Sequence, residues 1–273
     1  MTALQFLEIF AIAIGAGVFG SMLGLGGGII LVPALVAIAR VEPRVAVAAS
    51  IVSVIATSSA AAIAYVRDRC ADVRLGVYLE TATTAGALLG AVTARHLSGE
   101  TVAGLFAVLL LYSAMALLRP PRPPPARLRP EPESFRGAYF DLVEKREVSY
   151  EVHRVRLGLG ASFLAGIISA ILGVGGGIVK VPVMVTRMGV PLRVAVATSN
   201  FMIGVTATTT AIPYYLHGDV DPYLAAPCAL GVLIGARGGA RLAQKTRAKW
   251  IRAVFAAVLA YTALAMARRA GLL

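Results

Sequence analysis

The chain has 273 residues, of which 58% are hydrophobic and only 15% are charged, and its mean hydropathy is +0.78. This composition excludes an ordinary soluble domain and predicts repeated membrane spans, each of which needs about 20 mostly apolar residues. In a soluble protein the net charge of +12 would suggest nucleic-acid binding. Here the basic residues gather between apolar segments, where they set membrane orientation, so we expect no nucleic-acid partner.

Apolar segments follow one another in two similar series. The first series comprises 4–23, 29–39, 45–66, 75–94 and 101–118, and the second comprises 157–172, 178–188, 194–216, 223–243 and 250–267. The second segment of each series is too short to cross a bilayer, because 11 residues of helix rise only about 16 Å. We therefore predict that each half contains a glycine-broken or re-entrant helix pair followed by three long transmembrane helices.

The two series are copies of one ancestral half. A shift of 149 residues aligns 20–35 (GSMLGLGGGIILVPAL) with 169–184 (SAILGVGGGIVKVPVM) without a gap, and eight of the sixteen positions are identical. In the same register, RVAVAAS at 44–50 aligns with RVAVATS at 193–199. Chance does not hold one register over such a distance, so the repeat is real.

The repeat divides the chain into three parts. We predict a first transmembrane repeat at 1–118, a Pro/Arg-rich linker at 119–156 and a second transmembrane repeat at 157–273. The linker begins RPPRPPPARLRPEPE, and its prolines favour extended polyproline II over helix. Its tail, 134–152, is interpreted either as a short surface helix or as a solvated linker.

Loop charges predict the orientation. If the linker is cytoplasmic and the segments alternate sides, eighteen basic loop residues lie inside and five outside, as the positive-inside rule requires. Loop 67–74 has three arginines, whereas its repeat partner 216–223 has none. This opposition predicts two inverted-topology repeats, typical of secondary transporters, with both termini outside. Arg44 and Arg193 are equivalent but lie on opposite sides, so they either anchor helices at the headgroups or face the two mouths of a pathway.

Both halves carry the pattern GxGGG directly before a short helical segment. Such glycines let the backbone bend sharply and approach a ligand, and the N-terminus of the following helix is a natural anion site. The alternative is close helix packing, for which membrane proteins also use small residues. We predict an anion-binding site that includes Gly24, Gly26, Gly27, Gly28, Gly173, Gly175, Gly176 and Gly177.

Two basic residues lie inside apolar segments. Lys180 and Arg237 each replace a leucine of the first half, and a central charge costs about 2.5–3.5 kcal/mol on insertion scales. A bound anion would offset this cost, so both are candidate anion ligands. The alternative is that their long side chains simply reach toward the membrane surface.

Other polar side chains complete the predicted site. Ser50, Ser199 and Asn200 begin the long third segments and are able to hydrogen-bond either an oxyanion or neighbouring helices. Glu80 is the deepest acid, and a lone membrane carboxylate is a candidate proton carrier for coupled transport. It is equally a candidate structural partner of Lys180 or Arg237.

The sequence contains no recognisable catalytic motif and no cluster of metal-binding residues. Its three histidines, His96, His153 and His217, are too dispersed for a metal site or a catalytic triad, and only two cysteines are present. No paired-Asp or HExxH arrangement occurs. We therefore predict a protein that is not an enzyme and that uses no cofactor.

The repeated G-x-G-G-G-x-x-x-x-P and the R-V-A-V-A-x-S that follows it resemble the sulfite exporter TauE/SafE family, also called the toluenesulfonate uptake permease family. The resemblance covers both halves and excludes the central linker. It implies a multi-pass plasma-membrane carrier of sulfur-containing anions, such as sulfite, organosulfonates or related oxyanions, whose direction differs between members.

We therefore expect an all-α polytopic membrane protein that moves a small sulfur-containing anion by alternating access within the lipid bilayer. A coupled proton or cation, the direction and the oligomeric state are left open. The alternatives are an anion channel and a carrier for a non-sulfur organic anion.

Overall fold

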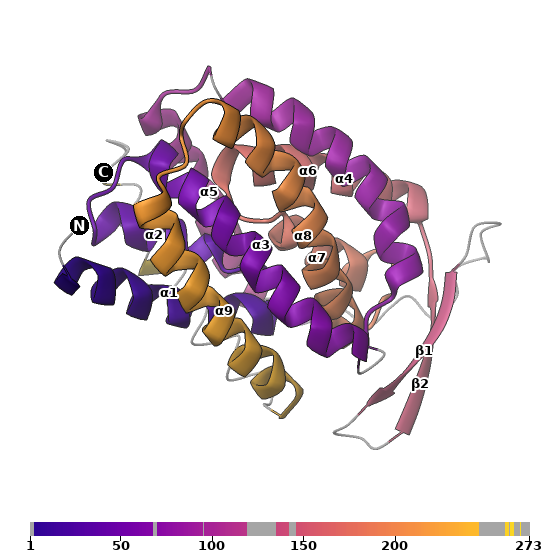
Figure 1. Ribbon diagram of the computed structural model, residues 1–273. Helices are drawn as coiled ribbons and strands as arrows, with labels where there is room; N and C mark the ends of the chain where they lie inside the picture. The colour runs from indigo at the N-terminus through magenta and orange to yellow at the C-terminus, as the bar shows by residue number, and fades with distance from the viewer. Residues whose placement is uncertain are drawn as a thin grey trace.

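A computed structural model describes residues 3–67, 70–94, 96–118, 135–141 and 146–245, with positions 260, 261, 263, 264 and 268. The helices of the first half are α1 (Ala3–Leu23), α2 (Gly28–Ala37), α3 (Pro43–Arg67), α4 (Val73–Ala94) and α5 (Gly99–Leu118), shown in Figure 1. Those of the second half are α6 (Val155–Leu172), α7 (Gly177–Thr186), α8 (Leu192–Leu216) and α9 (Pro222–Lys245). The segment predicted at 250–267 lies largely outside the described residues.

All nine helices named above begin and end within two residues of the predicted segments. Within the described residues, five stretches are long and apolar enough to cross a membrane: Leu4–Leu23, Pro43–Arg67, Val73–Ala94, Val155–Leu172 and Pro222–Leu242. By contrast, α2 and α7 have ten residues each and follow their preceding helices after a short glycine turn. The prediction of a broken helix pair in each half is confirmed.

The tail of the linker forms a β-hairpin, so its interpretation as a short helix or a solvated linker was wrong. Strands β1 (Phe135–Asp141) and β2 (Arg146–Val152) pair antiparallel, with Phe135 opposite Val152. Alternate residues share a face of a strand, and here one face is apolar: it carries Phe135, Tyr139, Val148, Tyr150 and Val152, which pack against the helices. Figure 1 shows the hairpin at one edge of the helical body.

The two halves exchange helices across their interface. α1 packs along α9, and α6 packs along α4, so the first helix of each half lies against the fourth helix of the other. The contacts match one another at the repeat distance. A Cβ atom added at Gly86 would lie 2.0 Å from Phe163 O, and one added at Gly235 would lie 2.1 Å from Ile14 O. Such reciprocal contacts relate the halves by an approximate two-fold axis.

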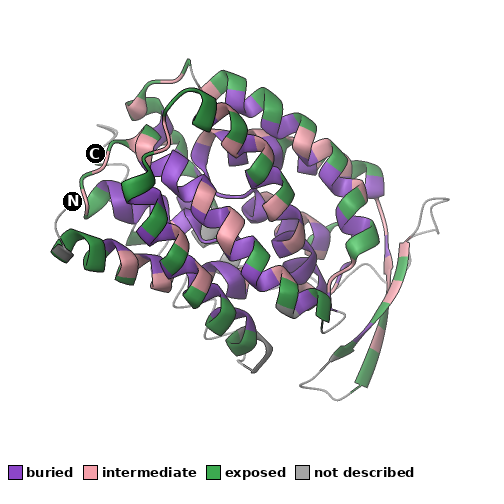
Figure 2. Ribbon diagram, in the orientation of Figure 1, coloured by how far each residue is buried: buried purple, intermediate pink, exposed green. Residues whose placement is uncertain are grey.

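The equivalent helices α3 and α8 run antiparallel through the centre. Asp72, just beyond the end of α3, donates its backbone N–H to Thr198 near the start of α8. At the same end, Tyr65 of α3 and Asn200 of α8 both donate to Ser21 O. Equivalent helices that run in opposite directions are what an inverted repeat requires. Figure 2 shows the buried residues gathered on these central helices, with exposed residues on the outer faces.

Candidate functional site

The two glycine turns adopt the same left-handed backbone. Gly24, Gly26 and Gly27 have φ values of 71°, 78° and 79°, and their partners Gly173, Gly175 and Gly176 have 67°, 76° and 70°. Residues with a side chain rarely adopt this conformation. The sequence GxGGG therefore fixes an abrupt reversal between each long helix and the short helix that follows it.

Each turn presents the start of a short helix. The first hydrogen bonds of α2 are donated by Ile30 and Leu31 to Gly27 O, and those of α7 by Val179 and Lys180 to Gly176 O. The N–H groups before these donors have no partner inside their helix. They carry the positive end of the helix dipole and suit an anion.

The turns of the two halves meet at the centre of the molecule. A Cβ atom added at Gly28 would lie 2.2 Å from Gly173 O, and one added at Gly177 would lie 2.0 Å from Gly24 O. The glycines at these positions are therefore required by close packing, the alternative given above, whatever else they do. The contact also brings together the two predicted halves of the anion site.

Two serines link the turns. The Ser50 hydroxyl donates to Gly173 O at 2.9 Å, and the Ser199 hydroxyl donates to Gly24 O at 2.8 Å. Both serines are buried and each crosses from one half to the other. Their hydrogens thus hold the opposite turn in place and are not directed at a ligand in this conformation.

Asn200 is fully buried beside Ser199. Its amide nitrogen donates to Ser21 O and Val196 O, both at 3.1 Å, while its Oδ1 has no hydrogen-bond partner among the described residues. Its equivalent in the first half is Ile51. The buried amide side chain therefore occurs in one half only, and its atom without a partner, Oδ1, is a hydrogen-bond acceptor.

Tyr65 and Tyr214 are equivalent positions of the repeat, and neither is among the predicted site residues. The Tyr65 hydroxyl donates to Ser21 O at 3.1 Å, and the Tyr214 hydroxyl donates to Ala170 O at 3.0 Å. The two acceptors lie in the last turns of α1 and α6, where backbone carbonyls lack helical partners. These contacts could have been predicted from the presence of a tyrosine at equivalent positions in two apolar segments.

A buried ion pair lies beside the second turn. Lys180 Nζ is 3.6 Å from Glu80 Oε2, and both side chains are almost completely buried. Thr206 of α8 donates to the other carboxylate oxygen, Oε1. Of the alternatives given for Glu80, partnership with Lys180 is realised. The repeat partner of Lys180 is Leu31 in the first half, and that of Glu80 is Ala229 in the second half, so this pair has no counterpart at the equivalent place.

The other basic candidates lie elsewhere. Arg237 is exposed on α9 and is not part of the buried cluster around Glu80. Arg44 donates to Leu97 O, a contact that fixes it at the end of a helix, in keeping with the anchoring interpretation. The structure therefore brings Lys180, and not Arg237, to the neighbourhood of the glycine turns.

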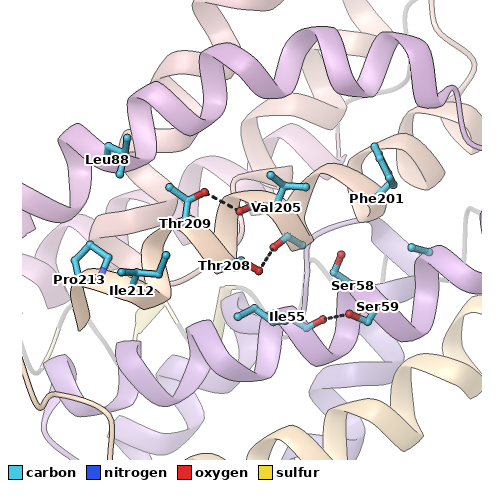
Figure 3. Close-up of a pocket in the computed structure, with 12 residues that line it drawn as sticks. Ile55, Ser58, Ser59, Leu88, Phe201, Val205, Thr208, Thr209, Ile212 and Pro213 are labelled. Atoms are coloured by element: carbon cyan, nitrogen blue, oxygen red, sulfur yellow. Dashed lines mark hydrogen bonds between the residues drawn. The ribbon is translucent and has the colours of Figure 1, made fainter. Parts of the chain in front are cut away.

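A groove of about 520 Å³ lies between α3 and α8, with Leu88 of α4 beside it (Figure 3). Its polar lining is made of hydroxyl groups, and those of Ser59, Thr208 and Thr209 donate to carbonyls of their own helices. Its lining residues include no charged side chain. The groove was not predicted, and it offers an anion no charge of opposite sign.

These features define a class: an α-helical, multi-pass membrane protein built from two halves that each contain a broken helix, the architecture of secondary transporters. The comparisons narrow the class. The model of the family described as sulfite exporter TauE/SafE matches residues 9–266. The chain belongs to this family, as its repeated motif indicated.

Two relatives are similar to this chain along most of their length, and a third over a short stretch. A probable membrane transporter protein of Bacillus subtilis, YunE, is 25% identical over 94% of this chain and 95% of its own. A probable membrane transporter protein of Xylella fastidiosa is 25% identical over 88% of this chain and 87% of its own. The sulfite exporter TauE/SafE family protein 6 of Arabidopsis thaliana is 42% identical, but over only 21% of this chain and 13% of its own. No solved structure matches the chain.

Proposed function

We propose that the protein is a secondary transporter, and not an enzyme, which moves a small sulfur-containing oxyanion across the plasma membrane by alternating access. In this proposal the linker is cytoplasmic and both termini are outside. Membership of the TauE/SafE family supports transport, and the name of that family suggests sulfite as a first substrate to test.

One observation carries the choice of an anion. The short helices α2 and α7 begin at glycine turns that touch each other, so two positive helix ends from opposite halves point into one region. The amides at 26–29 and 175–178 would bind the oxyanion, and Lys180 would balance its charge. Ser50 and Ser199 would hold the turns, while Arg237, which is exposed, is left out of the proposed site.

Alternating access follows from the reciprocal contacts. Because Ser50 and Ser199 make equivalent bonds in opposite directions, a rearrangement that opens one turn has an equivalent that opens the other. The site at the two-fold axis would then face the two sides of the membrane in turn.

The test is counterflow in proteoliposomes that contain the purified full-length protein. Vesicles loaded with sulfite should take up labelled sulfite saturably, and unlabelled sulfoacetate or thiosulfate outside should compete where they are substrates. Empty liposomes serve as the control. Absence of counterflow with every oxyanion would refute the proposal, and single-channel conductance in place of saturable exchange would favour a channel.

Two serine variants connect this activity to the glycine turns. Ser50→Ala and Ser199→Ala each remove one bond between the halves and are expected to lower counterflow at least about tenfold, since about 1.4 kcal/mol corresponds to a factor of ten. Ser59→Ala is the matched control, because the Ser59 hydroxyl is exposed and binds only its own helix. Equal counterflow activity of all three variants would show that the bonds between the glycine turns are not needed for transport.

A further inference from the structure

The ion pair between Lys180 and Glu80 is incompletely satisfied. The two charged groups lie 3.6 Å apart, and within the described residues neither Lys180 Nζ nor Glu80 Oε2 has a hydrogen-bond partner. An ammonium group has three donors, and leaving them unused in a buried position is costly. The pair therefore holds a cation whose hydrogen-bonding capacity is open to a second acceptor.

The position of Lys180 indicates where that acceptor would lie. Its backbone N–H closes the first turn of α7 on Gly176 O. Long side chains on a helix normally cover the turn that precedes them, so rotation about its own side-chain bonds can bring the Lys180 ammonium to the amides at Gly177 and Ile178. Lys180 can thus reach both Glu80 and the proposed anion site.

The surroundings of Glu80 allow few other charges to take part. On α8 it faces Thr206, and on α7 it faces Lys180. The stretch 157–172 of α6, which packs on α4, has no charged residue. On the hairpin, Arg136 pairs with Glu151 on the exposed face, whereas the hairpin face that packs against the helices is apolar. Among the described residues around Glu80, the net charge is therefore set by Lys180 and Glu80 themselves.

We propose that Lys180 exchanges partners during transport: its ammonium pairs with the Glu80 carboxylate when the site is empty, and with the oxyanion when Glu80 has taken up a proton. This inference rests on the proposed function. A monovalent anion that joined an intact ion pair would leave one unbalanced charge in a buried place, which is expensive. One proton on Glu80 restores neutrality, so each negative charge enters together with one proton.

The asymmetry of the repeat sets the stoichiometry. The place equivalent to this centre keeps a threonine, Thr57, as the counterpart of Thr206, but has Leu31 in place of Lys180 and Ala229 in place of Glu80. The molecule therefore contains one such exchange centre in its described part and not two. We expect one proton for each monovalent anion, moving in the same direction as the anion.

The first experiment needs no variant. Sulfite is added to weakly buffered, purified full-length protein in detergent on the acid side of neutrality, where it is largely the monovalent hydrogensulfite ion, and the pH is recorded against protein-free solution titrated identically. The wild-type protein is expected to take up about one proton per bound anion, by the neutrality argument. Binding of sulfite without proton uptake would overturn the inference.

The second experiment separates coupling from transport. In proteoliposomes, Glu80→Gln is expected to lose at least about tenfold more of the sulfite accumulation driven by an inward proton gradient than of sulfite counterflow, because exchange does not need an empty carrier to reorient. Glu100→Gln, which changes an exposed carboxylate at the start of α5, is the control and should keep both activities.

The outcomes distinguish the two proposals. If the wild type shows counterflow and Glu80→Gln accumulates sulfite under a proton gradient as well as the wild type does, the partner exchange is overturned. Anion transport itself is then still supported. Absence of counterflow in the wild type overturns anion transport and this inference with it. If Glu80→Gln does not fold, the double variant Glu80→Ala with Lys180→Leu replaces it: without the exchanging pair, bound sulfite should bring no proton through this centre, and an unchanged uptake of about one proton per bound anion contradicts the inference.

Discussion

The Tyr150 hydroxyl donates a 3.0 Å hydrogen bond to Asp72 Oδ2 and so ties the β-hairpin to the start of α4. Asp72 is already committed to the helix, because its Oδ1 accepts the N–H of Leu75 in the first turn. Beside this contact, Phe135 packs against Tyr78 with ring centroids 5.6 Å apart, and Arg74 lies 5.2 Å above the Phe135 ring. The end of the linker is thus a docked element of the membrane domain.

Tyr150→Phe is expected to loosen the hairpin without unfolding the helices. The change removes one hydrogen bond to a carboxylate at a half-buried position, which we expect to cost about 1 kcal/mol. Proteolysis of the folded protein in detergent should cleave after Arg136 or Arg146 several-fold faster in the variant. Asp72→Ala, which also removes the cap of α4, should be the more damaging change.

The same contact predicts a pH dependence. Burial raises the pKa of Tyr150 above its ordinary value, and the nearby Asp72 carboxylate raises it further. The raised pKa means that the hydroxyl contributes its full stability below about pH 10, where an unfolded tyrosine ionises, and loses it as the pH rises further. The difference in melting temperature between wild type and Tyr150→Phe should therefore stay constant up to about pH 9 and shrink as the pH rises above about pH 10. A constant difference would contradict this assignment.

The bonds that Ser50 and Ser199 make between the halves should be worth similar amounts. Each substitution by alanine leaves a buried carbonyl, Gly173 O or Gly24 O, without its donor, at a cost of about 1–3 kcal/mol. Thermal unfolding in detergent should show comparable losses for both variants. A large loss in one and none in the other would mean that the two turns are not held equivalently.

Glycines on the packed helices should divide into two groups. Alanine at Gly86 or Gly235 would place a Cβ atom against a backbone carbonyl of the neighbouring helix, and we expect a loss of about 1–3 kcal/mol. Gly160 and Gly238 have no atom within 4 Å of an added Cβ. Alanine there should be neutral or stabilise the helix by up to about 1 kcal/mol. Melting temperatures of the four variants test this division directly.

The buried ion pair should behave as a unit. Lys180→Leu leaves the Glu80 carboxylate without its cation, and we expect a loss of about 3–5 kcal/mol. Adding Glu80→Ala restores most of it, because the double variant carries the apolar pair found at the equivalent positions, Leu31 and Ala229. A double-mutant cycle measured by thermal unfolding gives the coupling. Additive losses would show that the pair is not energetically linked.

Much of this architecture could be read from local patterns. Apolar segment lengths located the nine described helices within two residues, and the shift of 149 residues identified the two halves. The GxGGG motif required turns in the left-handed backbone region, which glycine alone adopts easily. The hairpin was missed because charged residues alternate with the aromatic ones, and only docking on the helices shows which strand face is buried.

The sequence by itself determined membrane insertion, the repeat and the positions of the helix breaks, because these depend on composition and on the conformational freedom of single residues. Tertiary structure decided which polar side chains meet. Lys180 and Arg237 looked alike in sequence, yet α7 buries one against Glu80 and α9 leaves the other exposed. Partners 100 residues apart are chosen by packing between helices, and no local pattern encodes that choice.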